Sequence, residues 1–323
     1  MKSNEVNAKH SWQPTLRSLA DGERYFYDPY TFKKEKIVWE ITERTLQGLP
    51  MTFSKCDMHD FGHSVSGTGE ALFLKSAAIK AFAEAWERLW VMRIGSTDVL
   101  PEYKIKSSNG FAAARTLTEA KLKSRDELIE RAALLKAWST PTAWQQINPV
   151  GFIAKALVHC LNRTDWTTSF YEVRIANGGS LFCGLLRSTK FGAIFDCLYK
   201  SESTINIAAI FSKLTRSLAR SINTQINRTV EDTWVLPTVG KPEDHGAFYT
   251  KVENLSAFDF LDKSPRRTSA PIALDDFNRI RSIKVIDTSG FPAVAFSHND
   301  AWPPFQWGKQ TITKENPWPH PLA

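Results

Sequence analysis

The chain has 323 residues, which is enough for one large domain or two ordinary ones with a full hydrophobic core. Hydrophobic residues make up 42% and charged residues 23%, so a disordered or collagen-like chain is excluded. The 41 basic residues outnumber the 34 acidic ones, and the net charge of +7 favours an anionic partner, whether nucleotide phosphate, nucleic acid or an acidic peptide.

The N-terminus and the cysteines indicate where the protein works. Residues 1–14 are polar and lack the apolar region of a signal peptide. No stretch approaches the roughly 18 consecutive apolar residues of a membrane-spanning helix. The four cysteines form no Cys-x-x-Cys pair, which favours reduced thiols. We therefore expect a soluble, cytoplasmic protein without a membrane partner.

The hydrophobic pattern predicts alternating helical and extended segments after a polar N-terminal stretch. In chain order we expect a turn-rich stretch at 63–69, a helix over 70–94, a helix over 118–138 capped by Thr116 or Thr118, strands within 168–200, a helix over 204–222, loop and helix over 240–270, strands at 283–286 and 293–296, and an irregular Pro- and Trp-rich tail over 302–323. This mixture predicts one large α+β domain.

The first predicted helix carries an unusual polar stripe. Its residues are apolar almost all round, which predicts burial, yet Lys80, Glu84, Glu87 and Arg88 lie on one side. Two carboxylates on a buried helix repel each other unless a cation compensates them. Two interpretations remain open at this point: a solvated stripe in which Lys80 and Arg88 pair with the glutamates, or a binding site.

The second predicted helix repeats the pattern. Glu127, Glu130 and Arg131 have the spacing of Glu84, Glu87 and Arg88, and Glu119 falls on the same face. Carboxylates together with arginine suit Mg²⁺ and a polyphosphate, because Mg²⁺ takes carboxylate and phosphate oxygens and arginine binds phosphate. The sequence has no Walker A and no Gly-x-Gly-x-x-Gly motif, so a nucleotide would bind by another route.

These motifs resemble those of the YcaO family of ATP-dependent amide-activating enzymes. The matching segments are the turn Ser66–Gly69 followed by Glu84, Glu87 and Arg88; the segment 108–114 followed by Glu119, Ala120, Glu127, Glu130 and Arg131; the segment 244–249, Asp-His-Gly-Ala-Phe-Tyr; and the Pro-x-Pro-x-Pro terminus over 317–323. The terminus is typical of the azoline-forming members.

The resemblance implies a fold and a set of site residues. The expected fold is a single large domain of mixed β-sheets flanked by helices that carry an ATP and Mg²⁺ site, with residues 1–50 as an N-terminal segment and 51–323 as the catalytic domain. The implied metal ligands are Glu84, Glu87, Glu127 and Glu130; the implied nucleotide contacts are Lys80, Arg88, Ser108, Arg115, Glu119 and Arg131; and the implied catalytic tail contains Pro317, Pro319, Pro321 and Ala323. We expect the histidines to be structural, and His245 is the best candidate for an exception, because it lies in a matching segment.

The chain also departs from the family pattern. Thr68 replaces the turn lysine, Lys80 replaces a helix serine, and Ala114-Arg115 replaces a glycine and a polar residue. A third helix of the family carries a Glu-x-x-Gln-like pattern, whereas the corresponding stretch here has a basic stripe of Lys213, Arg216 and Arg220. That stripe is either a solvated face or a docking surface for an acidic peptide or phosphate.

The implied activity is ATP-dependent cyclodehydration of a ribosomally made precursor peptide in natural-product biosynthesis. A Cys, Ser or Thr side chain attacks the preceding amide carbonyl, and ATP activates the amide oxygen as a leaving group, which yields a thiazoline or oxazoline. Two alternatives remain: formation of a thioamide or amidine, and a non-catalytic scaffold that binds the precursor.

The resemblance also implies partners. Many family members carry a leader-binding domain, for which the segment before residue 50 has no room, so we expect a separate leader-binding protein. An FMN-dependent azoline dehydrogenase and a second copy of the chain are further candidate partners, and no nucleic acid is expected.

Overall fold

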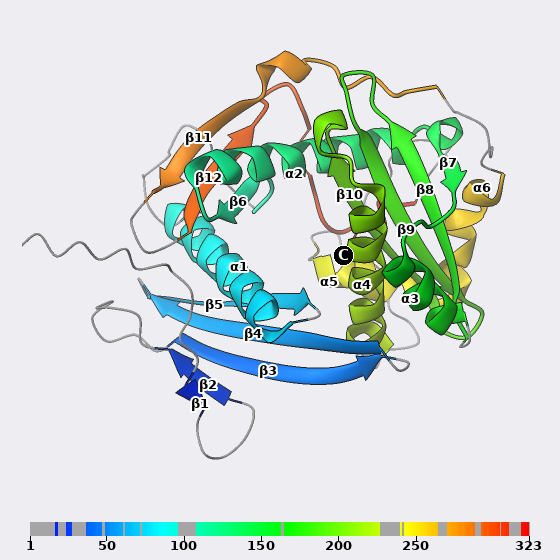
Figure 1. The fold of residues 1–323 in the computed structure, drawn as a ribbon. Helices are drawn as coiled ribbons and strands as arrows, with labels where there is room; N and C mark the ends of the chain where they lie inside the picture. The colour runs from blue at the N-terminus through cyan, green and yellow to red at the C-terminus, as the bar shows by residue number, and fades with distance from the viewer. Residues whose placement is uncertain are drawn as a thin grey trace, which may run out of the picture. The chain divides into compact units, whose positions relative to one another are not determined.

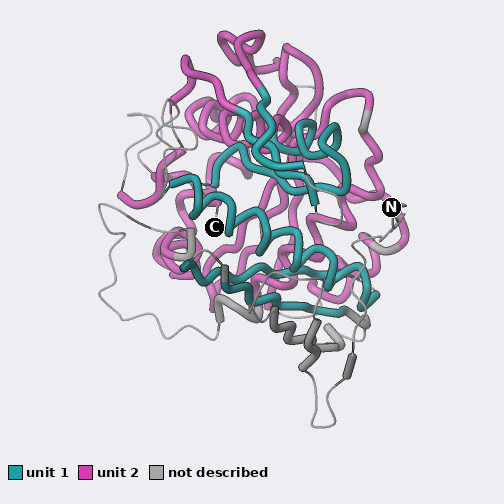
Figure 2. The backbone as a smooth tube through the Cα atoms, turned by 90° about the vertical axis from the view of Figure 1, so that its left-hand side faces the viewer, with its two compact units in different colours: residues 1–44, 50–124, 282–297 teal, residues 45–49, 125–281, 298–323 magenta. Residues whose placement is uncertain are grey.

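The computed structural model describes residues 17–18, 24–27, 37–46, 49–60, 62–71, 73–95, 108–162, 165–226, 240, 242–263, 270–287, 292–303, 305–309 and 318–322. The chain divides into two compact units, coloured separately in Figure 2. Unit 1 comprises residues 1–44, 50–124 and 282–297, and unit 2 comprises residues 45–49, 125–281 and 298–323. Whether residues 51–323 form one catalytic domain stays a prediction.

The secondary structure is α+β, as predicted (Figure 1). The helices are α1 Leu74–Gly95, α2 Leu117–Trp138, α3 Phe152–Asn162, α4 Ile207–Ile226, α5 Pro242–Tyr249 and α6 Asp259–Asp262. The strands are β1 Arg17–Ser18, β2 Arg24–Tyr27, β3 Ile37–Leu46, β4 Leu49–Asp60, β5 His63–Ala71, β6 Phe111–Ala114, β7 Gln145–Ile147, β8 Thr167–Arg174, β9 Ser180–Ser188, β10 Gly192–Lys200, β11 Arg281–Ile286 and β12 Ala293–His298.

Helix α1 supplies most of the buried side chains in the hydrophobic core of unit 1. A five-stranded sheet has the order β1-β2-β3-β4-β5, and a three-stranded sheet has the order β11-β12-β6. One hydrophobic cluster joins α1 to Cys56 and Met58 of the first sheet and to Phe111 and Phe296 of the second. Because both sheets contribute to this cluster, α1 is apolar on nearly every side. The predicted burial of this helix is therefore confirmed.

The predicted turn at 63–69 is wrong, because these residues form strand β5 and pair in antiparallel register with β4. Its glycines allow close packing rather than a turn. A Cβ atom at Gly67 would lie 2.1 Å from the Ala81 carbonyl oxygen, and one at Gly69 would lie 2.1 Å from the Ala77 carbonyl oxygen. Only glycine lets the backbone of β5 approach the small-residue side of α1 so closely.

Unit 2 is built around a four-stranded antiparallel sheet of order β10-β9-β8-β7. Helices α3 and α4 pack on one face, where Phe170, Phe182 and Leu214 are buried together (Figure 1). The other face of this sheet belongs to a large hydrophobic cluster that includes Trp138 of α2 and Phe258. Because both faces are covered, β9 and β10 are buried along almost their whole length.

The main helices and strands agree with the sequence prediction. Helix α2 has the predicted extent, and Thr116 caps it: its hydroxyl accepts a hydrogen bond from the Glu119 N–H at 3.2 Å. Strands β8, β9 and β10 fill the predicted extended region, and β11 and β12 are neighbours in one sheet. Within the described residues, no helix combines the length and the apolar character that a membrane crossing requires.

Candidate functional site

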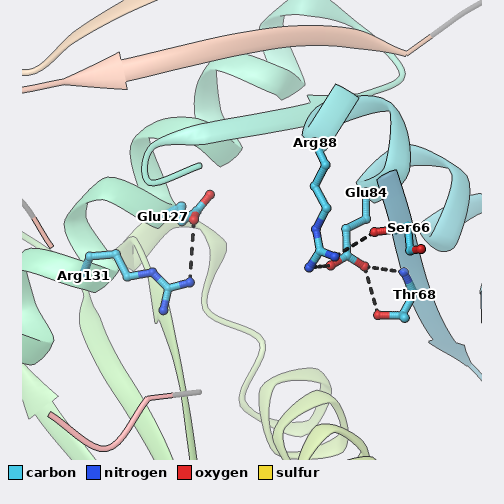
Figure 3. Close-up of polar contacts among 6 residues, drawn as sticks. All are labelled: Ser66, Thr68, Glu84, Arg88, Glu127 and Arg131. Carbon is cyan, nitrogen blue, oxygen red and sulfur yellow. Dashed lines mark hydrogen bonds and ion pairs between the residues drawn. The ribbon is translucent and has the colours of Figure 1, made fainter. Parts of the chain in front are cut away.

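In unit 1, the polar stripe of α1 contacts the outer edge of strand β5 (Figure 3). The Glu84 Oε2 atom accepts hydrogen bonds from the Thr68 N–H at 2.6 Å and the Thr68 hydroxyl at 3.1 Å. Arg88 donates to the Ser66 carbonyl at 2.7 Å and pairs with Glu84 Oε1 at 2.7 Å. Lys80 donates to the Glu70 carbonyl at 2.7 Å.

The residue spacing along helix α1 is close to that along strand β5, which explains these contacts. Residues four apart on a helix lie about 6 Å apart along its axis, and residues two apart on a strand lie about 6.7 Å apart. Lys80, Glu84 and Arg88 therefore reach alternate backbone positions of β5. Since β5 is the last strand of its sheet, these side chains satisfy polar groups that have no neighbouring strand. The stripe thus has a structural role whatever else it binds.

Glu87 points elsewhere in unit 1. One of its carboxylate oxygens accepts a hydrogen bond from the Ala113 N–H of strand β6 at 3.0 Å. The three other predicted nucleotide contacts of this unit, Ser108, Arg115 and Glu119, have exposed side chains. Their proposed contact with nucleotide stays a prediction.

In unit 2, helix α2 carries the second Glu-x-x-Glu-Arg motif, Glu127, Glu130 and Arg131. Figure 3 shows the ion pair between Glu127 and Arg131. Glu127 Oε1 lies 3.6 Å from the nearer Arg131 nitrogen, and both side chains are largely covered, at 24% and 21% exposed. Glu130 accepts a hydrogen bond from the Tyr199 N–H of β10 at 3.0 Å. Burial raises the pKa of Glu127 to about 7, Arg131 opposes this rise, and the neighbouring charge of Glu130 adds to it.

Further charges of unit 2 act on this set. Burial also raises the pKa of Glu130, while the positive charges of Arg131 and Lys213 lower it. Lys213 belongs to the basic stripe of α4 and its side chain is exposed. Both interpretations of the basic stripe, a solvated face and a docking surface, therefore stay predictions.

The C-terminal tail, residues 318–322, is tied down in unit 2 through three successive carbonyl groups. Trp138 of α2 donates to the Trp318 carbonyl at 3.0 Å. The Tyr249 hydroxyl donates to the Pro319 carbonyl, and His245 Nδ1 donates to the His320 carbonyl at 2.7 Å. Tail residues 319–322 are buried. No pattern in the sequence indicates that Trp138 binds the tail. Tyr249 and His245 lie in the 244–249 segment that matches the family, and this match is the signal that could have pointed to them.

His245 is held as one neutral tautomer. Its Nε2 atom accepts a hydrogen bond from the Gly308 N–H at 2.7 Å, so its proton lies on Nδ1, which donates to the tail. Burial lowers the pKa of His245. The ring of His320 stacks on it with centroids 4.4 Å apart, and burial lowers the pKa of His320 to about 3. Both histidines are therefore uncharged at neutral pH.

The predicted tail residues have different outcomes. Pro319 and Pro321 are buried, where the absence of a backbone N–H leaves no unsatisfied donor. Pro317 and Ala323 lie outside the described residues. A catalytic role for this terminus stays a prediction.

The unit 2 carboxylates fit a hard divalent cation that also binds phosphate. Among the described residues, no group of three or more His, Cys, Asp or Glu side chains is placed to hold a metal ion. Mg²⁺ commonly takes only one or two carboxylates and completes its shell with phosphate oxygens and water. Glu127 and Glu130 supply two carboxylates within one helical turn of α2, and a bound cation would offset the burial that disfavours their ionised forms. In unit 1, by contrast, both Glu84 oxygens already have donors.

The fold is that of known structures. No protein-family model matches the sequence, and no curated protein matches it. The structure is similar to a chain of the E. coli microcin synthetase McbBCD complex with pro-MccB17 bound, with a TM-score of 0.58, 12% identity, and coverage of 85% of this chain and 90% of that one.

Two further solved structures have the same fold. YcaO from Methanopyrus kandleri bound with AMPPCP and Mg²⁺ gives a TM-score of 0.55, 10% identity, and coverage of 87% of this chain and 91% of that one. A heterocyclase in complex with substrate and cofactor gives a TM-score of 0.56 and 12% sequence identity. The match covers 87% of this chain and 53% of the heterocyclase. The chain therefore has the fold of YcaO proteins, and the fold expected from the sequence resemblance is confirmed.

Proposed function

We propose that the chain is an ATP- and Mg²⁺-dependent cyclodehydratase that converts Cys, Ser or Thr residues of a precursor peptide into azoline rings. One observation carries the proposal: a largely covered carboxylate pair and an arginine lie together on α2, in a fold shared with a nucleotide-binding YcaO protein. Burying two carboxylates is unfavourable unless cations compensate them. Arg131 is the largely buried cation beside them, and Lys213, which also lowers their pKa values, is exposed.

The roles of the residues follow from their chemistry. In this proposal Glu127 and Glu130 hold Mg²⁺, and Arg131 binds phosphate oxygens through its planar guanidinium. The sequence resemblance adds a proposal for unit 1: Glu84 and Glu87 as further Mg²⁺ ligands, and Lys80 and Arg88 as nucleotide contacts. ATP, when bound, supplies the phosphoryl group that converts an amide oxygen into a leaving group.

The proposal includes a peptide substrate and a complex. The microcin synthetase whose chain has this fold is a multi-subunit complex with pro-MccB17 bound. By analogy, we propose that this chain modifies a ribosomally made peptide together with a leader-binding protein. An azoline dehydrogenase that uses FMN would act on the product.

A second candidate is a non-catalytic scaffold that binds the precursor. One observation favours it: Lys80, Glu84 and Arg88 all contact the backbone of β5, so a structural requirement alone would explain their presence. The unit 2 carboxylates argue against this alternative, because burial raises the pKa of both Glu127 and Glu130 although Arg131 lies beside them, which favours a cation ligand.

The test is peptide dehydration measured by mass spectrometry. Short Cys-, Ser- and Thr-rich peptides, chosen from reading frames near this gene, are incubated with the chain and Mg-ATP, with and without any candidate leader-binding protein found there. The cyclodehydratase account predicts loss of one water for each ring, with the lost oxygen recovered in inorganic phosphate. Glu127→Gln and Glu130→Gln should abolish the reaction, whereas Glu202→Gln, which alters an exposed carboxylate of unit 2, should not. Precursor binding without ATP cleavage would favour the scaffold.

A further inference from the structure

His320 links the C-terminal tail to Arg131 through a single aromatic ring. The rings of His320 and Phe305 have centroids 4.1 Å apart and are tilted by 41°. The guanidinium carbon of Arg131 lies 5.2 Å from the centroid of the same Phe305 ring. Arg131 in turn pairs with Glu127 at 3.6 Å. A continuous series of contacts within unit 2 thus runs from the tail to the α2 carboxylate.

The position of the His320 ring is strongly constrained. Its Nε2 atom donates to the Gln306 carbonyl at 2.7 Å, next to Phe305 in the chain. The ring also stacks on His245 at 4.4 Å, with an angle of 18° between the planes. His320 is fully buried, so its ring has no freedom to swing into solvent. The tail and its anchors therefore fix one side of the Phe305 ring.

Arg131 depends on that ring for its orientation. An arginine side chain has many rotamers, and holding it in one of them requires contacts along its length. Its ion pair with Glu127 is 3.6 Å long, which by itself defines the guanidinium plane poorly. A cation over an aromatic face is attracted to the ring, and a planar guanidinium also stacks on it. Phe305 therefore supplies the contact that orients the plane.

We propose that His320 is a positioning residue for Arg131 and acts through Phe305. Seating of the tail holds Phe305, Phe305 orients the guanidinium, and the guanidinium faces Glu127 in a fixed geometry. Phe305 also contacts Trp307, with ring centroids 5.0 Å apart. Removal of the His320 ring takes away the support on the tail side, so that Phe305 and the guanidinium can change orientation. The consequence for nucleotide affinity rests on the proposed function, whereas the positioning of Arg131 does not.

The direct test is the NMR signal of the Arg131 Nε–Hε group in the full chain, identified by its loss in Arg131→Lys. In the wild type, the ring current of Phe305 should shift this signal upfield. His320→Ala should move it to the usual arginine range, and His320→Phe, which keeps an aromatic ring, should restore the shift. His320→Leu replaces the alanine variant if that variant does not fold. An unchanged upfield signal in a folded variant without the ring would overturn the proposal.

Nucleotide binding provides the second measurement, with His159→Ala as a control on an exposed histidine of the same unit. His320→Ala should weaken binding of Mg-AMPPCP about tenfold, as expected when a residue that orients a ligand group is lost, while His320→Phe and His159→Ala stay near the wild type. Equal affinity in all variants would contradict the inference. If the wild type itself does not bind Mg-AMPPCP, the proposed function fails, and the NMR signal alone decides the positioning role.

Discussion

The ionisation of Glu127 is the most informative single-residue property of the candidate site. A carboxyl group with a pKa of about 7 is partly protonated at neutral pH, and burial is the main cause. A divalent cation can bind only the ionised form. Cation binding at this position must therefore compete with a proton, unlike binding at an exposed carboxylate, which is already ionised.

This competition predicts a pH dependence for nucleotide binding. The affinity for Mg-AMPPCP should increase as the pH is raised through about 7, because Glu127 loses its proton over that range. Calorimetry in buffers of different ionisation enthalpy should show proton release on binding below this pH. The Glu127→Gln variant should bind more weakly and lack this dependence. A flat profile in the wild type would exclude Glu127 from the cation site.

The stacked, buried histidines His320 of the tail and His245 of α5 predict a second pH effect, on stability. The pKa of His320 is about 3 in the folded chain, whereas an unfolded histidine titrates near 6.5. Its contribution to stability is therefore complete above about pH 6.5 and is lost as the pH falls toward about 3, since only the unfolded chain takes up the proton in that window. His245 acts in the same direction.

The measurement is thermal unfolding as a function of pH. Between neutral pH and about pH 4, the melting temperature of the wild type should fall more steeply than that of His320→Phe, which has no ionisable ring at this position. Comparing the two chains removes the common effect of the other titrating groups. Equal slopes would mean that the His320 ring is not held uncharged in the folded protein.

At the level of elements, α1 and β5 form the tightest pair of unit 1. The helix presents alanines to two glycines of the strand, and its polar stripe contacts the strand edge beside them. Packing and hydrogen bonding thus act at the same interface. Both depend on the short distance between the backbones of α1 and β5.

Gly67→Ala tests this interface. The new Cβ atom would lie 2.1 Å from the Ala81 carbonyl oxygen and 2.3 Å from the Ala85 nitrogen, both backbone atoms that cannot move independently of the helix. We expect a loss of about 3 kcal/mol in the free energy of unfolding, measured with denaturant. Ser64→Ala, at an exposed position of the same strand, should change it by less than about 0.5 kcal/mol. Similar stability of both variants would show that α1 does not pack on β5 this closely.

The same pair shows what the sequence can and cannot predict. The periodicity of α1 predicted its burial and its polar stripe correctly, because both depend on residues within one element. It could not reveal that Lys80, Glu84 and Arg88 contact the edge of β5, since the partner strand was interpreted as a turn. Glycines are common in turns and in close contacts alike, and composition does not distinguish the two.

For the whole molecule, the resemblance to YcaO proteins led to the right fold, although sequence identity to the solved structures is only 10–12%. Motifs of a few residues were sufficient to indicate the fold, because most of them lie on β5, α1, α2 and α5, which are main elements of the two units. The tail was harder to predict. Its prolines and tryptophans indicated an irregular segment, but its burial and its anchors, Trp138, Tyr249 and His245, follow from long-range contacts that no local pattern encodes.

The central claim is that the α2 carboxylates bind a magnesium nucleotide, and calorimetric titration of the full chain with Mg-AMPPCP tests it most directly. We predict saturable binding by the wild type and by the control Glu202→Gln, and a loss of at least about tenfold in affinity for Glu127→Gln and Glu130→Gln. These substitutions keep the shape of the side chain and remove its charge, so folded variants report on the ligand role itself. Equal affinity in all four proteins, or no binding by the wild type, would contradict the claim.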